Sequence, residues 1–137
     1  MKIKLDEGAF APVRAYDTDG GIDLKAMHGQ RIMPNSSAVF RTGVHVQLPP
    51  GTCGLLVSKS GLNVNEKIVS TGLIDEGFTG EIIVRLFNHG EDSYLVSAGD
   101  KITQLIILPV IHEEIEIVDQ IQGGERGDNG CGSTGRR

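Results

Sequence analysis

Short runs of alternating apolar and polar side chains follow one another along this chain, and turn residues break them about every ten positions. In residues 44–48 every second side chain is apolar, and the sequence PPG at 49–51 ends the run. Alternation with a period of two is typical of a strand with one face on a core. No long window shows a helical stripe, although residues 60–66 could form one short helical turn. We therefore predict an all-β sandwich or barrel. Strands are expected in residues 3–5, 22–26, 44–48, 55–57, 82–87, 102–110 and 115–118.

The length of 137 residues fits one domain that is large enough to bury a core. The chain has no Trp, and the aliphatic residues that supply its apolar side chains suit sheets. The net charge of −5 argues against nucleic acid and acidic membranes as partners. If the ligand is a polyphosphate, its positive partners must be a few local side chains or a metal ion.

Two cysteines, Cys53 and Cys131, lie far apart in unlike contexts. Two such residues do not make a disulfide framework, so a reducing compartment is the expected location. The sequence shows neither a stretch of signal-peptide type at its start nor an apolar run long enough to span a membrane. We expect a cytoplasmic protein.

The last segment, QGGERGDNGCGSTGRR at residues 122–137, contains almost no apolar side chain. Such a segment cannot offset its ordering entropy by burial. We expect residues 1–121 to form a single β domain and residues 122–137 to form a flexible C-terminal arm. On composition the arm is either a disordered end or a glycine-rich segment that becomes ordered on a phosphate ligand.

Four segments have residue types that suit binding or catalysis. The sequence SKSGL at 58–62 follows a predicted strand and offers hydroxyls, backbone N–H groups and one cation to phosphate oxygens, although such a segment is more often a plain turn. In GDKITQL at 99–105, Gln104 is polar between apolar neighbours and could equally face solvent. The segment RGDNGCGSTG at 126–135 has bare backbone and several donors, but lacks the spacing of a P-loop.

The fourth segment, GLIDEGFTGE at 72–81, lies between two apolar runs and is interpreted as a β-hairpin with an irregular tip. Asp75 could be an ordinary turn former or a carboxylate held at the mouth of a pocket. Phe78 lies in the tip, where an aromatic ring has little structural reason to be, and this favours a role in binding a ligand.

Together with GIDLKA at 21–26, and in their order along the chain, these four segments resemble the five motifs of the trimeric dUTPase family. The sequence GIDLKA at 21–26 is similar to the first motif, AGxDLxA, and SKSGL resembles the second, PRSGLA. The sequences at 72–81, 99–104 and 126–135 match GxIDxxYxGE, GDxIxQ and RGxxGFGSTG. The resemblance covers nearly the whole chain.

This resemblance implies a jelly-roll-like β fold and a homotrimer in which each active site draws on three subunits. It also implies an enzyme that hydrolyses dUTP to dUMP and pyrophosphate with Mg²⁺ as cofactor. Asp75 is expected to orient or deprotonate the water that attacks the α-phosphorus, with Gln104 as a second hydrogen-bonding partner. Mg²⁺ would be held by the triphosphate, with its waters reaching Asp23.

The remaining expected roles concern substrate binding. Main-chain groups of residues 73–75 and 82–83 would recognise uracil, and the Phe78 ring would stack on the deoxyribose. The arm would close over a neighbouring subunit's site. The residues expected to bind substrate are Lys59, Ser60, Gly61, Gly72, Leu73, Ile74, Phe78, Ile83, Arg126, Cys131, Gly132, Ser133 and Thr134.

Four positions depart from the family pattern. Lys59 stands at the usual Arg and cannot form a planar bidentate contact with phosphate. Ser58 replaces Pro, and Phe78 replaces Tyr with loss of the hydroxyl only. Cys131 replaces the aromatic residue that stacks on uracil, so closure of the arm is expected to be weaker.

Two other functions fit the same fold. One is a dCTP deaminase or a bifunctional dCTP/dUTP enzyme, whose catalytic Glu lies in a different motif. The other is a non-catalytic nucleotide-binding regulator, against which the intact Asp75 and Gln104 argue.

Overall fold

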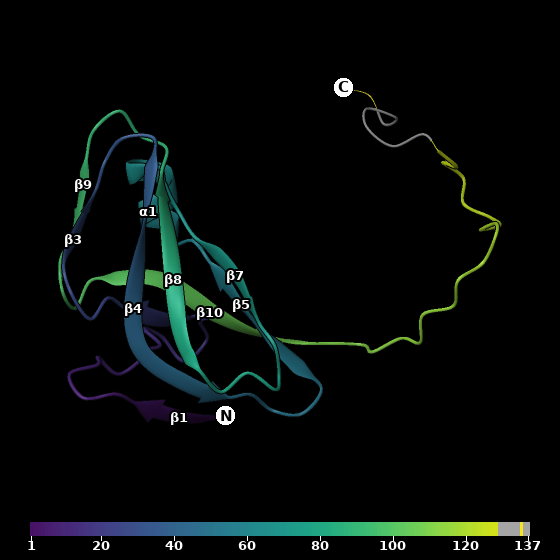
Figure 1. Ribbon diagram of the computed structural model, residues 1–137, viewed down its shortest axis with the longest axis horizontal. Coiled ribbons are helices and arrows are strands. Elements are labelled where there is room, and N and C mark those ends of the chain that lie inside the picture. Colours follow the sequence, from purple (N-terminus) through teal and green to yellow (C-terminus); the bar gives the residue numbers. More distant parts are fainter. Residues whose placement is uncertain (129–134, 136–137) are drawn as a thin grey trace.

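The computed structural model describes residues 1–128 and 135, and its strands form three antiparallel sheets (Figure 1). The first sheet has the order β1(Lys2–Leu5), β4(Ser36–Gln47), β8(Glu81–Asn88), β6(Ile68–Val69). The second has the order β2(Ile22–Lys25), β10(Lys101–Pro109), β5(Thr52–Val57), β7(Thr71–Ile74). The third pairs β3(Gln30–Ile32) with β9(Tyr94–Val96). The predicted all-β class is confirmed.

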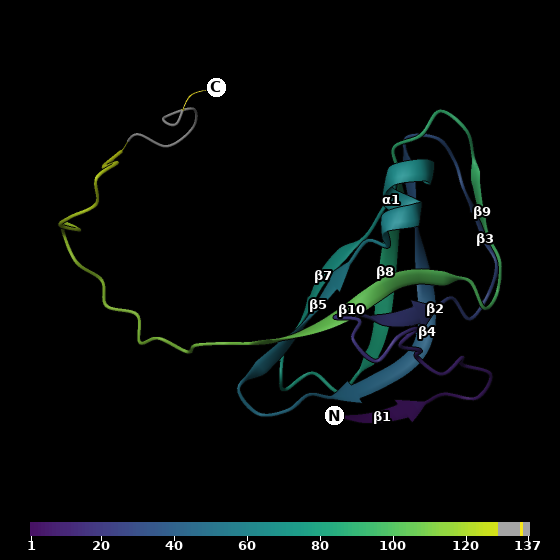
Figure 2. The ribbon, with the colours of Figure 1, turned by 180° about the vertical axis from the view of Figure 1, so that it is seen from behind.

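The predicted short helical turn is also confirmed, as α1(Ser60–Glu66), seen clearly from behind in Figure 2. It ends at Lys67, which has a left-handed backbone with φ of 56°. Among the described residues, no helix has the length and apolar character needed to cross a membrane.

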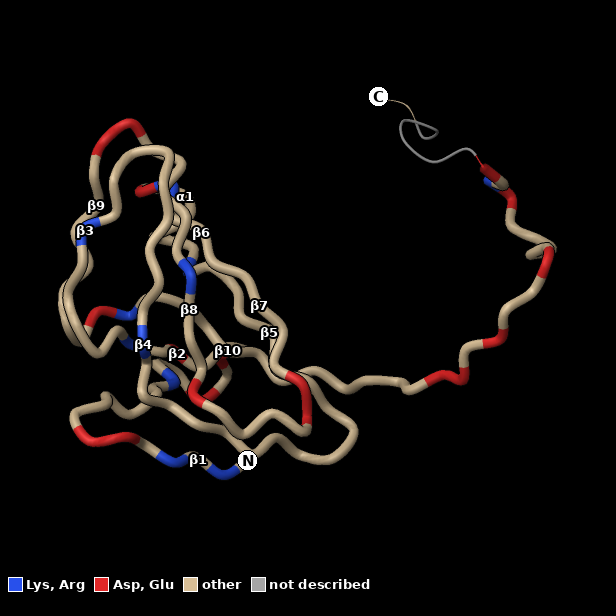
Figure 3. Tube along the Cα trace, in the orientation of Figure 1, with Lys and Arg blue, Asp and Glu red and all other residues tan. Residues whose placement is uncertain are grey.

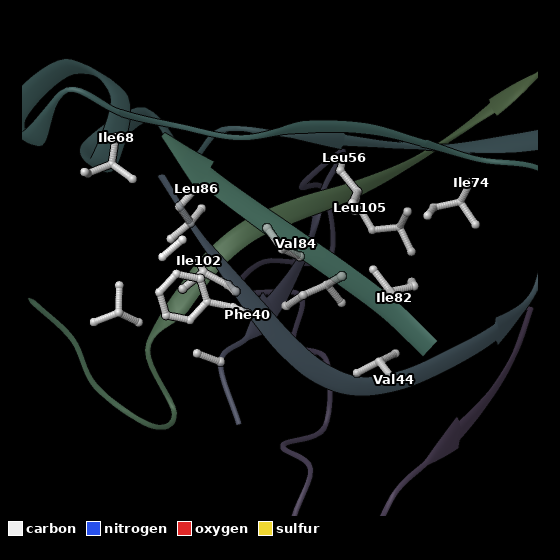
Figure 4. Close-up of a cluster of buried hydrophobic side chains, with 14 of the residues drawn as sticks. Phe40, Val44, Leu56, Ile68, Ile74, Ile82, Val84, Leu86, Ile102 and Leu105 are labelled. Atoms are coloured by element: carbon white, nitrogen blue, oxygen red, sulfur yellow. The ribbon is translucent and has the colours of Figure 1, made fainter. Parts of the chain in front are cut away.

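The core lies between the two four-stranded sheets and is built from the inward side chains of alternating strand positions (Figure 4). On β8 the alternation is complete, with Ile82, Val84 and Leu86 buried and the residues between them exposed. Phe40 of β4 is the largest fully buried side chain. Each such side chain contributes about 1.5–3 kcal/mol on burial, and apart from Phe40 the buried core is aliphatic, as predicted from composition.

A bulge interrupts the pairing of β4 with β8. Arg41 pairs with Ile83 and His45 pairs with Glu81, so β4 spends four residues where β8 spends two. Gly43 has φ of +63°, and a Cβ there would lie 2.6 Å from the Cβ of Ala9, so only glycine fits. Bulges re-aim the side chains beside them. His45, at the end of this bulge, contacts Thr79 in the loop that follows β7.

The strand predicted for residues 115–118 is wrong. The last strand, β10, ends at Pro109, and Val110 makes one more backbone hydrogen bond, to Gly51. Beyond it the described chain leaves the body of the domain (Figure 1), and Ile115 and Ile117 are more than 90% exposed. The segment does alternate apolar and acidic side chains, but a strand needs a hydrogen-bonded neighbour, and among residues 1–128 and 135 the segment has none.

Candidate active site

The first group of predicted site residues surrounds Asp23, whose carboxylate is almost fully buried. The Lys59 ammonium lies 2.5 Å from one carboxylate oxygen, and the Lys101 ammonium lies 2.8 Å from the other. Burial works to raise the pKa of Asp23, but the hydrogen bonds and positive charges of Lys101 and Lys59 outweigh it and hold that pKa below its ordinary value. The three side chains form a cluster with a net positive charge, which suits an anionic ligand.

Gln104 completes this group, which we call the Asp23 cluster: Asp23, Lys59, Lys101 and Gln104. Gln104 pairs with Asp23 on β2 and with Val57 on β5. A Cβ on Gly21 would lie 2.7 Å from Gln104 Oε1, so the bare glycine makes the space that the amide occupies. Ser60 and Gly61 are the first residues of α1, directly after Lys59. The structure therefore brings together residues predicted from three separate motifs.

Lys101 is a residue of this cluster that the sequence analysis missed. It lies between Asp100 and Ile102 at the start of β10, in a segment interpreted only for Gln104. β10 lies between β2, which carries Asp23, and β5, after which Lys59 follows, and this order brings both ammoniums to one carboxylate. Lys101 was visible in the sequence as a cation in the fourth motif. The strand pairing that brings it to Asp23 joins segments far apart in sequence.

Buried hydroxyls fix the backbone behind the cluster. The Ser58 hydroxyl donates to the Ser70 carbonyl and accepts from the Ser70 N–H, at 3.0 and 2.9 Å. The Ser70 hydroxyl lies 2.9 Å from that of Thr103, which donates to the Val57 carbonyl. Ser58, which stands at the usual Pro, thus ties the chain just before Lys59 to β6 and β7.

The second group of predicted residues lines a pocket of about 270 Å³ between β7 and β8, here called the β7–β8 pocket. The predicted β-hairpin is wrong, because β7 pairs with β5 in one sheet and β8 pairs with β4 and β6 in the other. The two strands diverge into different sheets, and their facing edges leave the pocket between them. Its lining residues are Leu73, Ile74, Asp75, Phe78, Glu81, Ile82 and Ile83.

The facing edges give the pocket its chemistry. Among the described residues, β7 is hydrogen-bonded only to β5, and β6 pairs with β8 only at the far end, opposite Asn88 and Phe87. Main-chain N–H and C=O groups alternate along a free strand edge. The pocket therefore has a row of fixed donors and acceptors on two walls, while its side chains are mostly apolar. Gly72, predicted as a binding residue, lies on β7 but outside the lining.

The loop of residues 75–80, here called the 75–80 turn, closes the pocket. The Phe78 N–H donates to the Asp75 carbonyl at 3.0 Å, which forms the turn. A Cβ on Gly80 would lie 2.7 Å from Phe78 Cζ, so the aromatic ring rests against the bare backbone of Gly80. Asp75 is exposed at the pocket's edge and its side chain is free to meet a ligand or water.

Asp75 and Gln104 do not come together within one chain. Asp75 follows Ile74, the partner of Gly54, and therefore stands opposite Cys53, whereas Gln104 stands opposite Val57. Four residues along β5 and two strand spacings across the sheet separate their Cα atoms by about 16 Å. Two side chains cannot share one water over that distance. The two halves of the predicted site lie on the same sheet but face separate regions of it.

Between the two halves, the outer face of this sheet is apolar. The register places Leu73, Leu55 and Ile106 side by side on β7, β5 and β10, in a row between the row of Gln104 and that of Asp75. Leu73 is 62% exposed, and Leu55 and Ile106 are half-buried. Side chains of this kind on a sheet face are typical of a surface that another protein surface covers.

The predicted residues of the arm divide into two groups. Arg126 is exposed and lies in a turn at residues 125–128, and the chain from about residue 111 to this turn extends away from the sheets (Figure 1). Cys131, Gly132, Ser133 and Thr134 lie outside the described residues.

The side chains that could bind Mg²⁺ are few. Within residues 1–128 and 135, no three His, Cys, Asp or Glu side chains gather in a way that could hold a metal ion. Both oxygens of Asp23 already contact ammonium groups. Mg²⁺ usually keeps several waters and binds through one or two carboxylates and substrate phosphates. The single carboxylate of Asp23 therefore fits a magnesium ion that is carried by a polyphosphate and contacted through water.

The sequence is similar to a family model described as dUTPase, over residues 8–135. It is 41% identical to a deoxyuridine 5′-triphosphate nucleotidohydrolase of Gloeothece citriformis, with 98% of this chain and 97% of the relative covered. A relative of the same name from Clostridium acetobutylicum is 37% identical, with 98% and 96% covered.

Solved structures give the same result for the fold. A dUTPase of Staphylococcus bacteriophage 80alpha with dUpNHpp is 29% identical, with a TM-score of 0.89 and coverage of 98% of this chain and 97% of that one. A dUTPase mutant from phage phi11 of S. aureus, described as coordinating a structural Mg(II) ion, is 28% identical with a TM-score of 0.80, and 87% of this chain and 96% of that one are covered.

Proposed function

This chain belongs to the dUTPase family, and we propose that it hydrolyses dUTP to dUMP and pyrophosphate in sites shared between copies of the chain. The observation that carries the proposal is the β7–β8 pocket, which has Asp75 at its edge. At about 270 Å³ it is slightly smaller than a typical ligand pocket, which suits the nucleoside part of the substrate and leaves the triphosphate outside.

The free edges of β7 and β8 support main-chain recognition of the base. Uracil presents an acceptor at O4 and a donor at N3, and cytosine presents the reverse. A wall of fixed N–H and C=O groups from Leu73 to Asp75 and from Ile82 to Ile83 would leave cytosine with unpaired polar groups. The Phe78 ring lines the pocket, and it would stack on the deoxyribose and exclude a 2′-hydroxyl.

The Asp23 cluster supports binding of the triphosphate. Lys59, with Ser60 and Gly61, would hold the α- and β-phosphates, and the structure adds Lys101 as a second cation. Mg²⁺, when bound with the nucleotide, neutralises phosphate charge and orients the triphosphate for in-line attack. Asp23 would accept hydrogen bonds from its water ligands. Arg126, Ser133 and Thr134 of the arm would contact the γ-phosphate.

The separation of about 16 Å between Asp75 and Gln104 in one chain supports the homotrimer. If a second copy covers the apolar row of Leu73, Leu55 and Ile106, the pocket of one chain comes to lie against the Asp23 cluster of another. Asp75 would then orient or deprotonate the water that attacks the α-phosphorus, and Gln104 would hold the same water or the α-phosphate.

The described chain beyond Pro109 also supports an assembly. Residues 111–121 carry exposed Ile111, Ile115, Ile117 and Ile121, alternating in part with acidic side chains, and this pattern suits pairing with a strand of another copy. We retain the assignment of residues 122–137 to an arm that acts on a neighbouring subunit.

The test is turnover of dUTP, dCTP, dTTP and UTP with Mg²⁺, measured side by side as pyrophosphate release, with ammonia release from dCTP as a further channel. We expect pyrophosphate from dUTP alone, and loss of about a hundredfold or more in Asp75→Asn, which keeps the shape of the side chain but not its charge. Release of ammonia from dCTP would indicate a dCTP deaminase or a bifunctional enzyme instead. Equal rates for wild type and Asp75→Asn would contradict the proposal.

A further inference from the structure

We propose that His45, in its imidazolium form, is a positioning residue that holds the 75–80 turn against the bound nucleoside, so that substrate binding weakens as His45 loses its proton. The inference rests on the proposed function for its substrate. It depends on contacts of a side chain that lies outside both halves of the candidate site.

The two ring nitrogens of His45 face two acceptors. Nδ1 lies 3.0 Å from the Thr79 carbonyl oxygen, and Nε2 lies 3.1 Å from a carboxylate oxygen of Asp6. A backbone carbonyl has no proton to donate, and an ionised carboxylate has none either. A neutral imidazole donates from one nitrogen only, so it would leave one acceptor facing a lone pair. Only the protonated ring satisfies both contacts.

Asp6 is held in the ionised form that this arrangement needs. Removal from solvent works to raise the pKa of Asp6, but hydrogen bonds from His45 and Lys4 and their charges outweigh it, and the pKa lies below its ordinary value. Arg41 also approaches Asp6, at 3.5 Å. Because Asp6 is ionised, the proton on His45 decides whether both ring contacts persist.

The charged surroundings of His45 come from three elements. Lys4 of β1 and Glu81 of β8 are its direct partners across the first sheet, one on each side. The carboxylate of Glu81 accepts hydrogen bonds from Arg41 and from the Gly43 N–H, at 2.9 and 2.8 Å. The charged groups that face His45 are thus Asp6, Glu81, Lys2, Lys4 and Arg41.

Within the described part of the chain, the contact to Thr79 is one of two side-chain hydrogen bonds that tie the turn to the rest of the domain; the other joins the Gly51 N–H to Glu76 at 2.8 Å. A hollow of about 510 Å³ lies behind Thr79, lined also by His45, Lys2 and Lys4. Phe78, the neighbour of Thr79, faces the β7–β8 pocket on the other side. His45 therefore connects β4 to the turn at the edge of this hollow. When the contact to Thr79 is lost, Phe78 becomes free to move away from the sugar.

The test compares wild type with His45→Gln and with His89→Gln, a matched control whose histidine is exposed and follows β8. KM and kcat for dUTP are measured at pH 6 and pH 8.5. Since one charge-assisted hydrogen bond is removed, we expect His45→Gln to raise KM about fivefold at pH 6, with kcat within about twofold, and to match wild type at pH 8.5. His89→Gln should follow wild type at both values.

A raised KM ratio that is the same at both pH values, or a fall in kcat instead, would overturn the inference. Loss of dUTP turnover in wild type would instead overturn the proposed function. Nitrogen NMR of the ring in the intact, unliganded protein gives a reading independent of substrate and of variants. We expect both ring nitrogens of His45 to carry a proton near pH 6. A neutral ring at that pH contradicts the inference. Asp6→Asn should move the proton's loss to lower pH.

Discussion

The amide of Gln104 occupies the space that a side chain at residue 21 would fill, since a Cβ on Gly21 would lie 2.7 Å from Gln104 Oε1. Gly21→Ala is therefore expected to displace the amide, because the closest clash falls on the far end of the side chain, while Gln104 Cβ, at 3.0 Å, has to shift only slightly. A misplacement of this size should lower kcat for dUTP by about tenfold or more. Gly20→Ala is the matched control, because a Cβ there meets nothing within 4 Å, and it should keep wild-type kcat. Equal loss in both variants would refute the packing role of Gly21.

Asp23 links stability to pH. Because its pKa is lowered in the folded protein, its ionised form contributes stability above the ordinary value of 3.8, and this contribution is lost as the pH falls through the lower, folded value. We expect Asp23→Asn to lose about 1–3 kcal/mol at pH 7, since two ammonium groups lose their partner. The difference from wild type should shrink below pH 4.

Urea unfolding at fixed protein concentration measures this difference. Asp17→Asn is the control, because Asp17 is exposed and close in sequence. A gap between wild type and Asp23→Asn that is as large at pH 3 as at pH 7 would contradict the ion-pair account.

Gly80 gives a second test of close packing, now at the pocket. A methyl group there would meet the Phe78 ring at 2.7 Å from Cζ and turn it away from the pocket, while the fold can absorb the shift. We expect Gly80→Ala to raise KM for dUTP by about tenfold with an unchanged unfolding midpoint. Gly77→Ala, in the same turn, adds a Cβ with nothing within 4 Å and should leave KM unchanged. A loss of stability in place of the KM effect would assign Gly80 to the fold alone.

The arm is expected to act in catalysis and not in folding. Residues 122–128 are exposed, so removal of residues 122–137 should leave the unfolding midpoint unchanged. Turnover of dUTP should fall about a hundredfold or more through loss of contacts to the γ-phosphate. Arg126→Ala in the full chain should reproduce most of the loss, whereas Glu125→Ala should stay within about twofold of wild type. Full turnover by the truncated chain would rule out the arm's proposed role.

Sequence patterns predicted the elements whose signal is local. Alternation located the cores of β2, β5, β8 and β10, and α1 was expected over the residues that form it. The same alternation in residues 115–118 predicted a strand that does not form within the chain, because periodicity does not show whether a partner strand is within reach. The 72–81 segment was interpreted as a hairpin for the same reason. Nothing local reveals that β7 and β8 join different sheets.

The candidate site divides along the same line. The motif residues Asp23, Lys59 and Gln104 were expected and do meet. Lys101 and His45 were not expected, because their partners come from distant strands and are set by sheet order and by the bulge in β4. Along the trace, lysines lie on β1 and acidic residues lie along the extended segment that follows β10 (Figure 3).

The central claim is that Asp75 of one chain acts together with Gln104 of another. It is tested most directly by unfolding Asp75→Asn and Gln104→Ala chains, refolding them together at equal amounts, and measuring dUTP turnover. Each variant alone should be inactive, and random assembly into trimers should restore up to about one quarter of wild-type turnover, since one site in four receives both intact residues. If hybrid trimers form, as native mass spectrometry can establish, and turnover stays at the level of the single variants, the shared site is contradicted.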